Sequence, residues 1–357
     1  MCKSSDAGSP ASERGLSHAS LGLALAHDCG PPYTPRPRAQ QHWEHSCCSI
    51  SKLERALANP DITAIEADIM VATEEQAQLL RKLGDRPGSL PIMAHPSPFS
   101  AAVPDTDLSF LEFLERCVSD GTRHLKLDFK QLAAVEPCLE LLSERWAQLH
   151  ANGQAVWLNA DILPGPNRRF APAVPSHAFI PLCRRLCPHA VLSLGWSVGP
   201  IGPEQVYTEA DIAEMLKVCK EYSLPGNSVV FAASVRFAER QIAVLDRLLD
   251  ALPDSQLLLW TGTGELPIPP ALQTRIHLEL AIKGRSDRIG YDVQLANSNM
   301  DHCASTLIDC TFFFSRWTRW ACSCCVTSIS MEHDLSRPIP GQIAGDRSPH
   351  ADPPLRT

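Results

Sequence analysis

Short apolar runs alternate with longer stretches of helical periodicity from His42 to about residue 280, and this alternation restricts the possible folds more than any other feature of the sequence. Each such pair is typical of a β–α unit, and repeated units build a parallel sheet covered by helices. We expect strands near 41–45, 64–70, 91–95, 123–129, 155–162, 190–196, 228–234 and 256–261. We expect helices near 50–58, 73–84, 108–118, 132–151, 177–187, 209–222, 236–251 and 268–274.

Eight β–α units are the number that a TIM-type (β/α)8 barrel of the phosphodiesterase kind requires. A doubly wound open sheet is the main alternative, but no glycine-rich phosphate-binding turn follows any expected strand. We assign residues 41–298 to the barrel. Residues 1–40 are rich in Ser, Pro, Gly and Arg and are expected to be a disordered extension. Residues 299–357 are expected to form an irregular tail that contains Cys and Pro.

The charge and cysteine content narrow the classes of partner and compartment. A net charge of −8 argues against a nucleic-acid-binding surface. No stretch is long and apolar enough to be a transmembrane helix, and no signal core is evident. Many of the 14 cysteines lie inside apolar helix-like runs, where they resemble buried free thiols. These features favour a reducing, cytoplasmic location.

Two carboxylates share one face of the expected strand 64–70. Side chains alternate along a strand, so Glu66 and Asp68 point to one side while Ile65, Ala67 and Ile69 point to the other. The apolar side packs against helices, which turns both carboxylates into the barrel mouth. Two like charges repel there unless a cation lies between them, and oxygen ligands suit Mg²⁺ or Ca²⁺.

The strand 123–129 has the same pattern. Burying its three large apolar residues contributes roughly 5 kcal/mol or more, which fixes its register and turns Lys126, Asp128 and Lys130 inward. Asp128 would complete a metal site of three carboxylates. Lys130 would hold a phosphate oxygen as a point charge. The alternative is a buried ion-pair cluster without a ligand, which is costly to maintain for stability alone.

Further polar and aromatic groups are expected around the same mouth. The strand 155–162 turns Trp157, Asn159 and Asp161 to one side. Trp157 and Trp196 are expected at strand ends, where they would line a pocket for a lipid or head group, with plain barrel packing as the alternative. His45 and His95 end two of the expected strands, at the end of the barrel where such enzymes do their chemistry.

Several long phrases in the chain carry a resemblance to a known family. They read W-x-H, I-E-A-D-I, P-I-M-A-H-P, L-K-L-D-F-K, A-V-E-P, V-W-L-N-A-D-I-L-P-G-P-N and L-S-L-G-W-S. Together they cover about residues 42–296 and resemble the menorin family (family with sequence similarity 151). The order His45, Glu66-x-Asp68, His95 and Asp128-x-Lys130 more distantly resembles glycerophosphodiester phosphodiesterases and sphingomyelinase D barrels.

The resemblance implies metal ligands at Glu66, Asp68 and Asp128, an acid–base pair at His45 and His95, and a phosphate contact at Lys130. It also implies roles in neuronal and sensory cells, a secreted or membrane-associated location for some members, and adhesion proteins as partners. The sequence departs from the family at Cys48, where the first-strand motif H-x-x-N-S has an asparagine.

The expected function is therefore metal-dependent cleavage of a phosphodiester, such as a glycerophosphodiester or a lysophospholipid. One histidine would deprotonate the attacking hydroxyl and the other would protonate the leaving alkoxide, while Lys130 and Lys126 would stabilise the transition-state charge. A non-catalytic binding or adhesion module that keeps the metal site is the rival. A sugar-cleaving barrel is disfavoured because Glu66 and Asp68 lie on one strand instead of flanking a bond.

Overall fold

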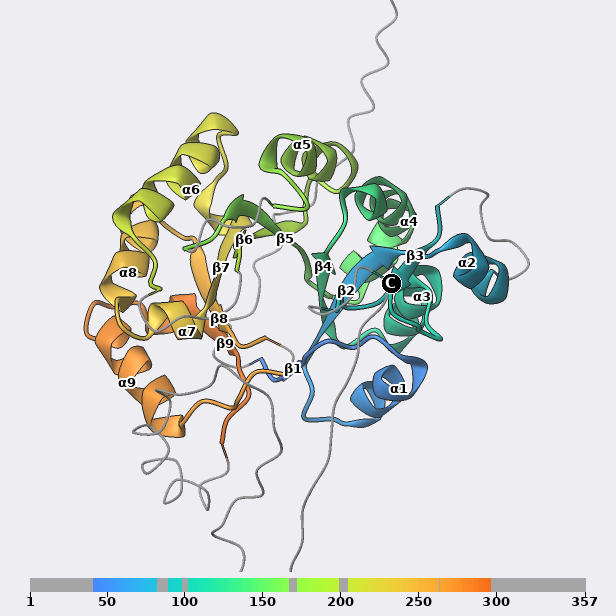
Figure 1. Ribbon diagram of the computed structural model, residues 1–357, viewed down its shortest axis with the longest axis horizontal. Coiled ribbons are helices and arrows are strands. Elements are labelled where there is room, and N and C mark those ends of the chain that lie inside the picture. Colours follow the sequence, from blue (N-terminus) through green and yellow to red (C-terminus); the bar gives the residue numbers. More distant parts are fainter. Residues whose placement is uncertain are drawn as a thin grey trace, which may run out of the picture. The chain divides into compact units, whose positions relative to one another are not determined.

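A computed structural model describes residues 41–81, 89–97, 102–166, 172–198, 205–262 and 264–296. The extensions expected at residues 1–40 and 299–357 lie outside these ranges. Within them the chain forms an α/β barrel of the TIM type, in which eight parallel strands are surrounded by helices (Figure 1). The expected fold class is confirmed.

The eight parallel strands pair in chain order. They are β1 (Trp43–Glu44), β2 (Ala64–Val71), β4 (His124–Phe129), β5 (Val156–Pro164), β6 (Val191–Ser197), β7 (Val229–Ser234), β8 (Gln256–Trp260) and β9 (Ile289–Asp292). The first and last strands are joined by side chains, since His45, just after β1, lies 3.1 Å from the Asp292 carboxylate at the end of β9.

One assignment of a barrel strand was wrong, and one barrel strand was not predicted. The run at 91–95 forms β3 (Pro91–Met93), which pairs antiparallel with β2 and is not one of the barrel strands. A buried apolar run looks the same in either direction, so its sequence does not encode which way it pairs. The eighth barrel strand is β9, which sequence reasoning did not find because it is four residues long and contains Gly290.

The helices follow the strands as expected, with one interruption. They are α1 (Ile50–Ala58), α2 (Glu74–Leu80), α3 (Phe110–Asp120), α4 (Leu132–Ala151), α5 (Ser176–Leu186), α6 (Glu209–Glu221), α7 (Val235–Ala238), α8 (Ile242–Ala251) and α9 (Pro270–Ala281). Thr73 and Thr208 each form a capping box at a helix start, as their sequences indicate. The single helix expected at 236–251 is divided into α7 and α8.

The barrel has apolar side chains on its outer face and two different layers inside. The outward residues of β4, namely Leu125, Leu127 and Phe129, are at most 1% exposed and pack under the helices. Inside the barrel, the half at the N-terminal ends of the strands holds an apolar layer, which we call the lower layer. It consists of Trp43, Ala155, Trp157, Val191, Val230 and Leu258. The half at the C-terminal ends of the strands holds charged side chains.

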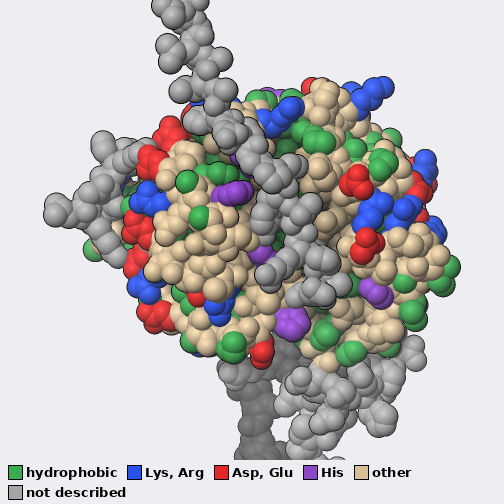
Figure 2. All heavy atoms as spheres, turned by 180° about the vertical axis from the view of Figure 1, so that it is seen from behind, with side chains coloured by type: hydrophobic (Ala, Val, Ile, Leu, Met, Phe, Trp, Pro, Cys, Tyr) green, Lys and Arg blue, Asp and Glu red, His purple; other side chains and the backbone are tan. Residues whose placement is uncertain are grey.

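The outer surface gives less functional information than the interior. On the face seen in Figure 2, Lys and Arg side chains are interspersed with Asp and Glu. Among the described residues, no helix combines the length and the apolar character needed to cross a bilayer.

Candidate functional site

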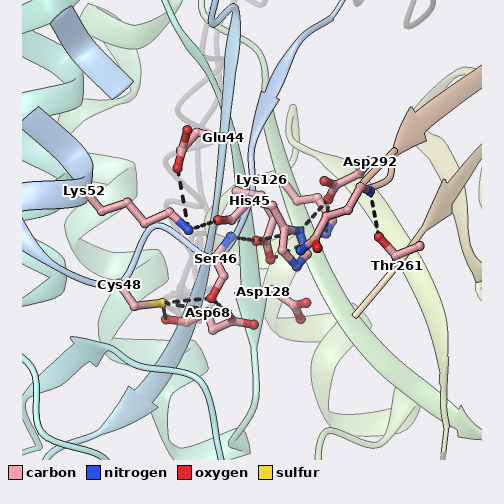
Figure 3. A network of polar contacts seen from close by, with 12 residues as sticks. Glu44, His45, Ser46, Cys48, Lys52, Asp68, Lys126, Asp128, Thr261 and Asp292 are labelled. Carbon is pink, nitrogen blue, oxygen red and sulfur yellow. Dashed lines mark hydrogen bonds and ion pairs between the residues drawn. The ribbon is translucent and has the colours of Figure 1, made fainter. Parts of the chain in front are cut away.

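The segment that follows β1 places the first functional side chain. Ser46 has a φ of 52°, in the left-handed region, and this turn directs its backbone N–H toward Glu66 Oε2 at 2.5 Å. The next amide, of Cys47, donates to the backbone oxygen of Glu66 at 2.8 Å. The Lys52 ammonium of α1 donates to the backbone oxygen of His45. His45 is therefore fixed at the barrel mouth by contacts on both of its flanks (Figure 3).

Three buried carboxylates lie beside this segment, as the alternation in β2 and β4 predicts. Glu66, Asp68 and Asp128 are 1%, 2% and 8% exposed. The parallel register places Asp68 next to Asp128 and Glu66 next to Lys126. One oxygen from each carboxylate lies within 4.8 Å of the others. The fold therefore brings together the three carboxylates that the sequence predicts as metal ligands.

Two lysines neutralise part of this charge: Lys126 lies in β4, and Lys130 directly follows it. Lys130 Nζ lies 3.0 Å from Asp68 Oδ1 and 2.8 Å from Asp128 Oδ2. Lys126 Nζ lies 3.6 Å from Glu66 Oε1 and 3.7 Å from Asp292 Oδ2. Both lysine pKa values are raised, because attraction to the carboxylates outweighs burial, which acts in the opposite direction.

The carboxylates of the cluster nevertheless outnumber its cations. With all five carboxylates ionised (Glu66, Asp68, Asp128, Asp161 and Asp292), Lys126, Lys130 and a protonated His45 would leave two negative charges uncompensated. The pKa of Glu66 is raised to about 7 by burial and by repulsion from Asp68. Burial also raises the pKa of Asp161 to about 7 against the attraction of Lys130. Without a further cation, these two acids would hold protons near neutral pH.

The donor set fits a hard divalent cation. Carboxylate oxygens are the ligands that Mg²⁺ and Ca²⁺ prefer, and a divalent ion would offset the two excess charges. Asp128 Oδ1 is buried, and among the described residues no hydrogen bond of good geometry reaches it, although a contact with the Asn159 side chain helps to lower the pKa of Asp128. A cation bound by Glu66, Asp68 and Asp128 would complete the contacts of this oxygen.

Asp292 is a member of the site that sequence reasoning missed. It is 3% exposed, and its Oδ2 lies 3.1 Å from His45 Nδ1. Burial raises its pKa, but attraction and the hydrogen bond from His45 outweigh burial, so the pKa is lowered overall. Burial alone would lower the pKa of His45, whereas Glu66 and Asp292 together raise it to about 9. The only available sequence signal was an aspartate at the end of a short, glycine-containing run.

Asn159 and Asp161 lie on β5 as expected. Asn159 is buried and accepts a hydrogen bond from the Ser193 hydroxyl at 2.6 Å. The Asp161 carboxylate lies against the backbone of Gly195, where an added Cβ would come within 2.6 Å of Asp161 Oδ1. The neighbouring strand β6 therefore needs a glycine at this level to leave space for the carboxylate.

The two tryptophans expected at the mouth lie elsewhere. Trp157 is the second residue of β5 and packs in the lower layer, with its ring centroid 4.9 Å from that of Trp43. Trp196 shares the outward face of β6 with Leu192 and Leu194, and it packs on Tyr207 between the sheet and the helices. Both indoles are at most 1% exposed, so each follows the packing alternative. Trp157 lies too deep in the barrel to reach the mouth, and Trp196 points outward from the barrel.

His95 remains the least connected of the predicted residues. It follows β3, and the amide of its neighbour Ala94 donates to the backbone oxygen of Asp68 at 2.9 Å, which brings this segment to the level of the cluster. The side chain is half-buried, and no hydrogen bond joins it to the carboxylates within the described ranges. Its catalytic role stays a prediction.

Cys48 also lies against the site. Its Sγ is 3.6 Å from Asp68 Oδ2 and 3.8 Å from the Ser46 hydroxyl. Burial and the charge of Asp68 raise the pKa of this thiol well above its usual range, so it is present as a neutral weak donor. The Ser46 hydroxyl donates to the same Asp68 oxygen at 3.1 Å. These two groups hold one face of the Asp68 carboxylate.

Comparisons with known proteins identify relatives of the chain. Residues 39–296 match the menorin N-terminal domain. The human protein FAM151B is 32% identical over 237 residues, which are 65% of this chain and 76% of that protein.

Two solved structures were also compared. A candidate glycerophosphoryl diester phosphodiesterase of Silicibacter pomeroyi is 12% identical, with a TM-score of 0.42 over 73% of this chain and 92% of that one. A glycerophosphodiester phosphodiesterase of Parabacteroides distasonis is 12% identical, with a TM-score of 0.38 over 77% and 95%. At this distance neither likeness bears on activity.

Proposed function

The chain belongs to the menorin family, and from this membership and the buried charge of the barrel mouth we propose that it is a phosphodiesterase that depends on a divalent metal ion. The observation that carries the proposal is the group of three buried carboxylates, Glu66, Asp68 and Asp128, of which one oxygen each lies within 4.8 Å of the others. A phosphodiester fits such a site because its own negative charge requires cations, which the metal and Lys130 would provide.

Glu66, Asp68 and Asp128 would hold the ion, with Mg²⁺ favoured by their hard oxygen ligands. The bound metal ion would polarise the phosphoryl group and offset its charge. Lys130 uses two of its three N–H donors on Asp68 and Asp128, which leaves one to bind a phosphate oxygen.

His45 would provide one half of the acid–base chemistry. Its Nδ1 faces Asp292 and Glu66, so its Nε2 is the nitrogen left for substrate. We assign the other half to His95, whose neighbour Ala94 donates its backbone amide to the backbone oxygen of Asp68. One histidine would remove the proton of the attacking hydroxyl and the other would give a proton to the leaving alkoxide.

The test is turnover of a panel of glycerophosphodiesters and lysophospholipids, with Mg²⁺ and with EDTA. We expect turnover with Mg²⁺ only, and its loss in Asp68→Asn, His45→Gln and His95→Gln. Asp246→Asn is the matched control, because Asp246 is a buried aspartate with cationic partners, Lys283 and Arg285, outside the barrel interior. Equal turnover in the wild type and Asp68→Asn would contradict the proposal.

The rival is a binding module that retains the metal site, favoured by Cys48 in place of the amide of the family motif. It predicts that the folded protein binds Mg²⁺, as measured by calorimetry, and that Asp68→Asn abolishes this binding. It also predicts that no phosphodiester of the panel is cleaved. This pattern of results would replace the enzymatic proposal.

A further inference from the structure

We propose that Asp292 is the residue that positions His45, by accepting a hydrogen bond from its Nδ1–H so that Nε2 faces the substrate. This inference rests on the proposed function for its catalytic meaning, but the hydrogen bond itself is independent of any activity. The carrying observation is the 3.1 Å contact between His45 Nδ1 and Asp292 Oδ2, which joins residues 247 positions apart in the sequence.

The aspartate is well placed to act as a fixed acceptor. Its side chain is 2% exposed, so little water reaches the carboxylate to compete for the hydrogen bond. Its backbone oxygen accepts from the Thr261 amide at 3.0 Å, and the Thr261 hydroxyl accepts from the Gln294 amide at 3.0 Å. These contacts hold the end of β9 against the end of β8.

The surrounding charges favour the same arrangement. Lys126 Nζ lies 3.7 Å from Asp292 Oδ2 and adds a second positive charge beside that carboxylate. Lys126 also lies 3.6 Å from Glu66 Oε1, so an ammonium group already neutralises this side of the cluster. For that reason we treat His45, Glu66 and Asp292 as an ion-paired group and not as a second metal site, although their ligand atoms are close enough for one.

Glu66 is the competing acceptor, since its Oε2 lies 3.4 Å from the same nitrogen. Two observations favour Asp292. Its distance is shorter, and Glu66 Oε2 already accepts the Ser46 amide at 2.5 Å. If Glu66 binds a cation, its oxygens are used further, whereas Asp292 lies outside the group of three carboxylates. The hydrogen bond that one ring nitrogen of a histidine makes sets which nitrogen is left for chemistry.

The contact also connects the site to the closure of the barrel. Within the described residues no backbone pairing joins β1 to β9, and the His45–Asp292 hydrogen bond is one of the contacts between these ends. The orientation of the imidazole therefore depends on the strand that completes the barrel.

The first experiment needs no substrate. In ¹H–¹⁵N spectra of the histidine ring N–H groups, we expect one slowly exchanging Nδ1–H, assigned to His45 by its loss in His45→Gln. It should disappear in Asp292→Ala, persist at a shifted position in Asp292→Asn, and stay unchanged in the Asp246→Asn control. A signal that persists in Asp292→Ala, belongs to Nε2, or exchanges in the wild type as fast as an exposed histidine would overturn the proposal.

The second experiment measures the consequence for turnover. We expect Asp292→Ala to lower kcat by about 10- to 100-fold, with KM within about threefold of the wild type. Asp292→Asn keeps an acceptor and the shape of the side chain, so it should recover part of kcat, and it decides the question if Asp292→Ala does not fold. Adding Asp292→Ala to His45→Gln should cost nothing further, because the two residues would act as one unit. Equal kcat in the wild type, Asp292→Ala and Asp292→Asn would contradict the positioning role.

The two proposals fail in different ways. If no phosphodiester is turned over, the proposed function fails, and the ring N–H spectra still decide whether Asp292 orients His45. If turnover is found but the spectra of Asp292→Ala keep the His45 signal, only the positioning role fails.

Discussion

The two layers inside the barrel are built from the same strands but have opposite characters. On β5, Trp157 lies in the lower layer. Asn159 and Asp161 follow on the same inward face, each about 6.6 Å further toward the barrel mouth. The lower layer is apolar and closely packed. The upper level, at the C-terminal ends of the strands, holds five carboxylates and three cationic groups, so two of its acids bind protons near neutral pH unless a further cation is present. One half of the interior thus packs for stability, and the other carries the carboxylates for which we propose a cation.

The largest expected effect is the loss of activity when a carboxylate of the upper level is replaced. Glu66→Gln removes a charge from the proposed metal site while keeping the side-chain shape, so Mg²⁺-dependent turnover should fall by about 10³-fold or more. The melting temperature without metal should not fall, because the substitution relieves repulsion from Asp68. Enzyme assays and thermal unfolding measure the two quantities. Unchanged turnover in this variant would end the functional contrast between the layers.

A substitution in the lower layer should show the reverse. Trp157 is fully buried, so Trp157→Ala should lower the free energy of unfolding by about 3–5 kcal/mol. Trp157→Phe is the matched control and should cost less because it keeps most of the ring. Denaturant unfolding measures the loss. A decrease below about 1 kcal/mol would show that this layer does not stabilise the barrel as its packing indicates.

The pH dependence of stability tests the charge of the upper level. Between pH 4.5 and about 7, folded Glu66 binds a proton that its unfolded form does not, so the free energy of unfolding falls as pH rises. His45 has the same effect between pH 6.5 and about 9, since its charged form is favoured in the folded state. The metal-free protein should therefore lose stability across this whole range.

Added Mg²⁺ should reverse this loss, because the ion competes with protons for Glu66. The increase in melting temperature caused by Mg²⁺ should be larger at about pH 8 than at about pH 5.5. Thermal unfolding at both values, with and without EDTA, measures it. An increase that is the same at both values would mean that the ion does not bind through Glu66.

The smallest expected effect concerns the space that β6 leaves for the upper level. Gly195→Ala would place a Cβ 2.6 Å from Asp161 Oδ1 and 3.3 Å from the backbone oxygen of Ala232, so it should cost about 1–3 kcal/mol of stability. The same change in an Asp161→Ala background should cost less, because the carboxylate is gone. Denaturant unfolding of the four proteins measures the coupling. Equal costs in both backgrounds would show that the added Cβ clashes with the backbone oxygen of Ala232 and not with Asp161.

Periodicity predicted most of the upper level correctly. In β2 and β4 a fully apolar outer face fixes the register, so Glu66, Asp68 and Asp128 had to point inward. It failed for the two tryptophans, because alternation gives the face of a side chain but not its level within the barrel. Trp157 lies on the predicted face at the wrong level, and Trp196 lies on the opposite face.

The sequence by itself determined the series of β–α units, the register of the long strands, the helix caps and the three neighbouring carboxylates. All of these depend on residues close together in the chain, where a period of two or 3.6 is sufficient information. Tertiary structure alone decided that 91–93 pairs antiparallel, that the short run 289–292 completes the barrel, and that Asp292 meets His45. These features depend on contacts between distant segments, and burial of the whole barrel, not a local pattern, makes them favourable.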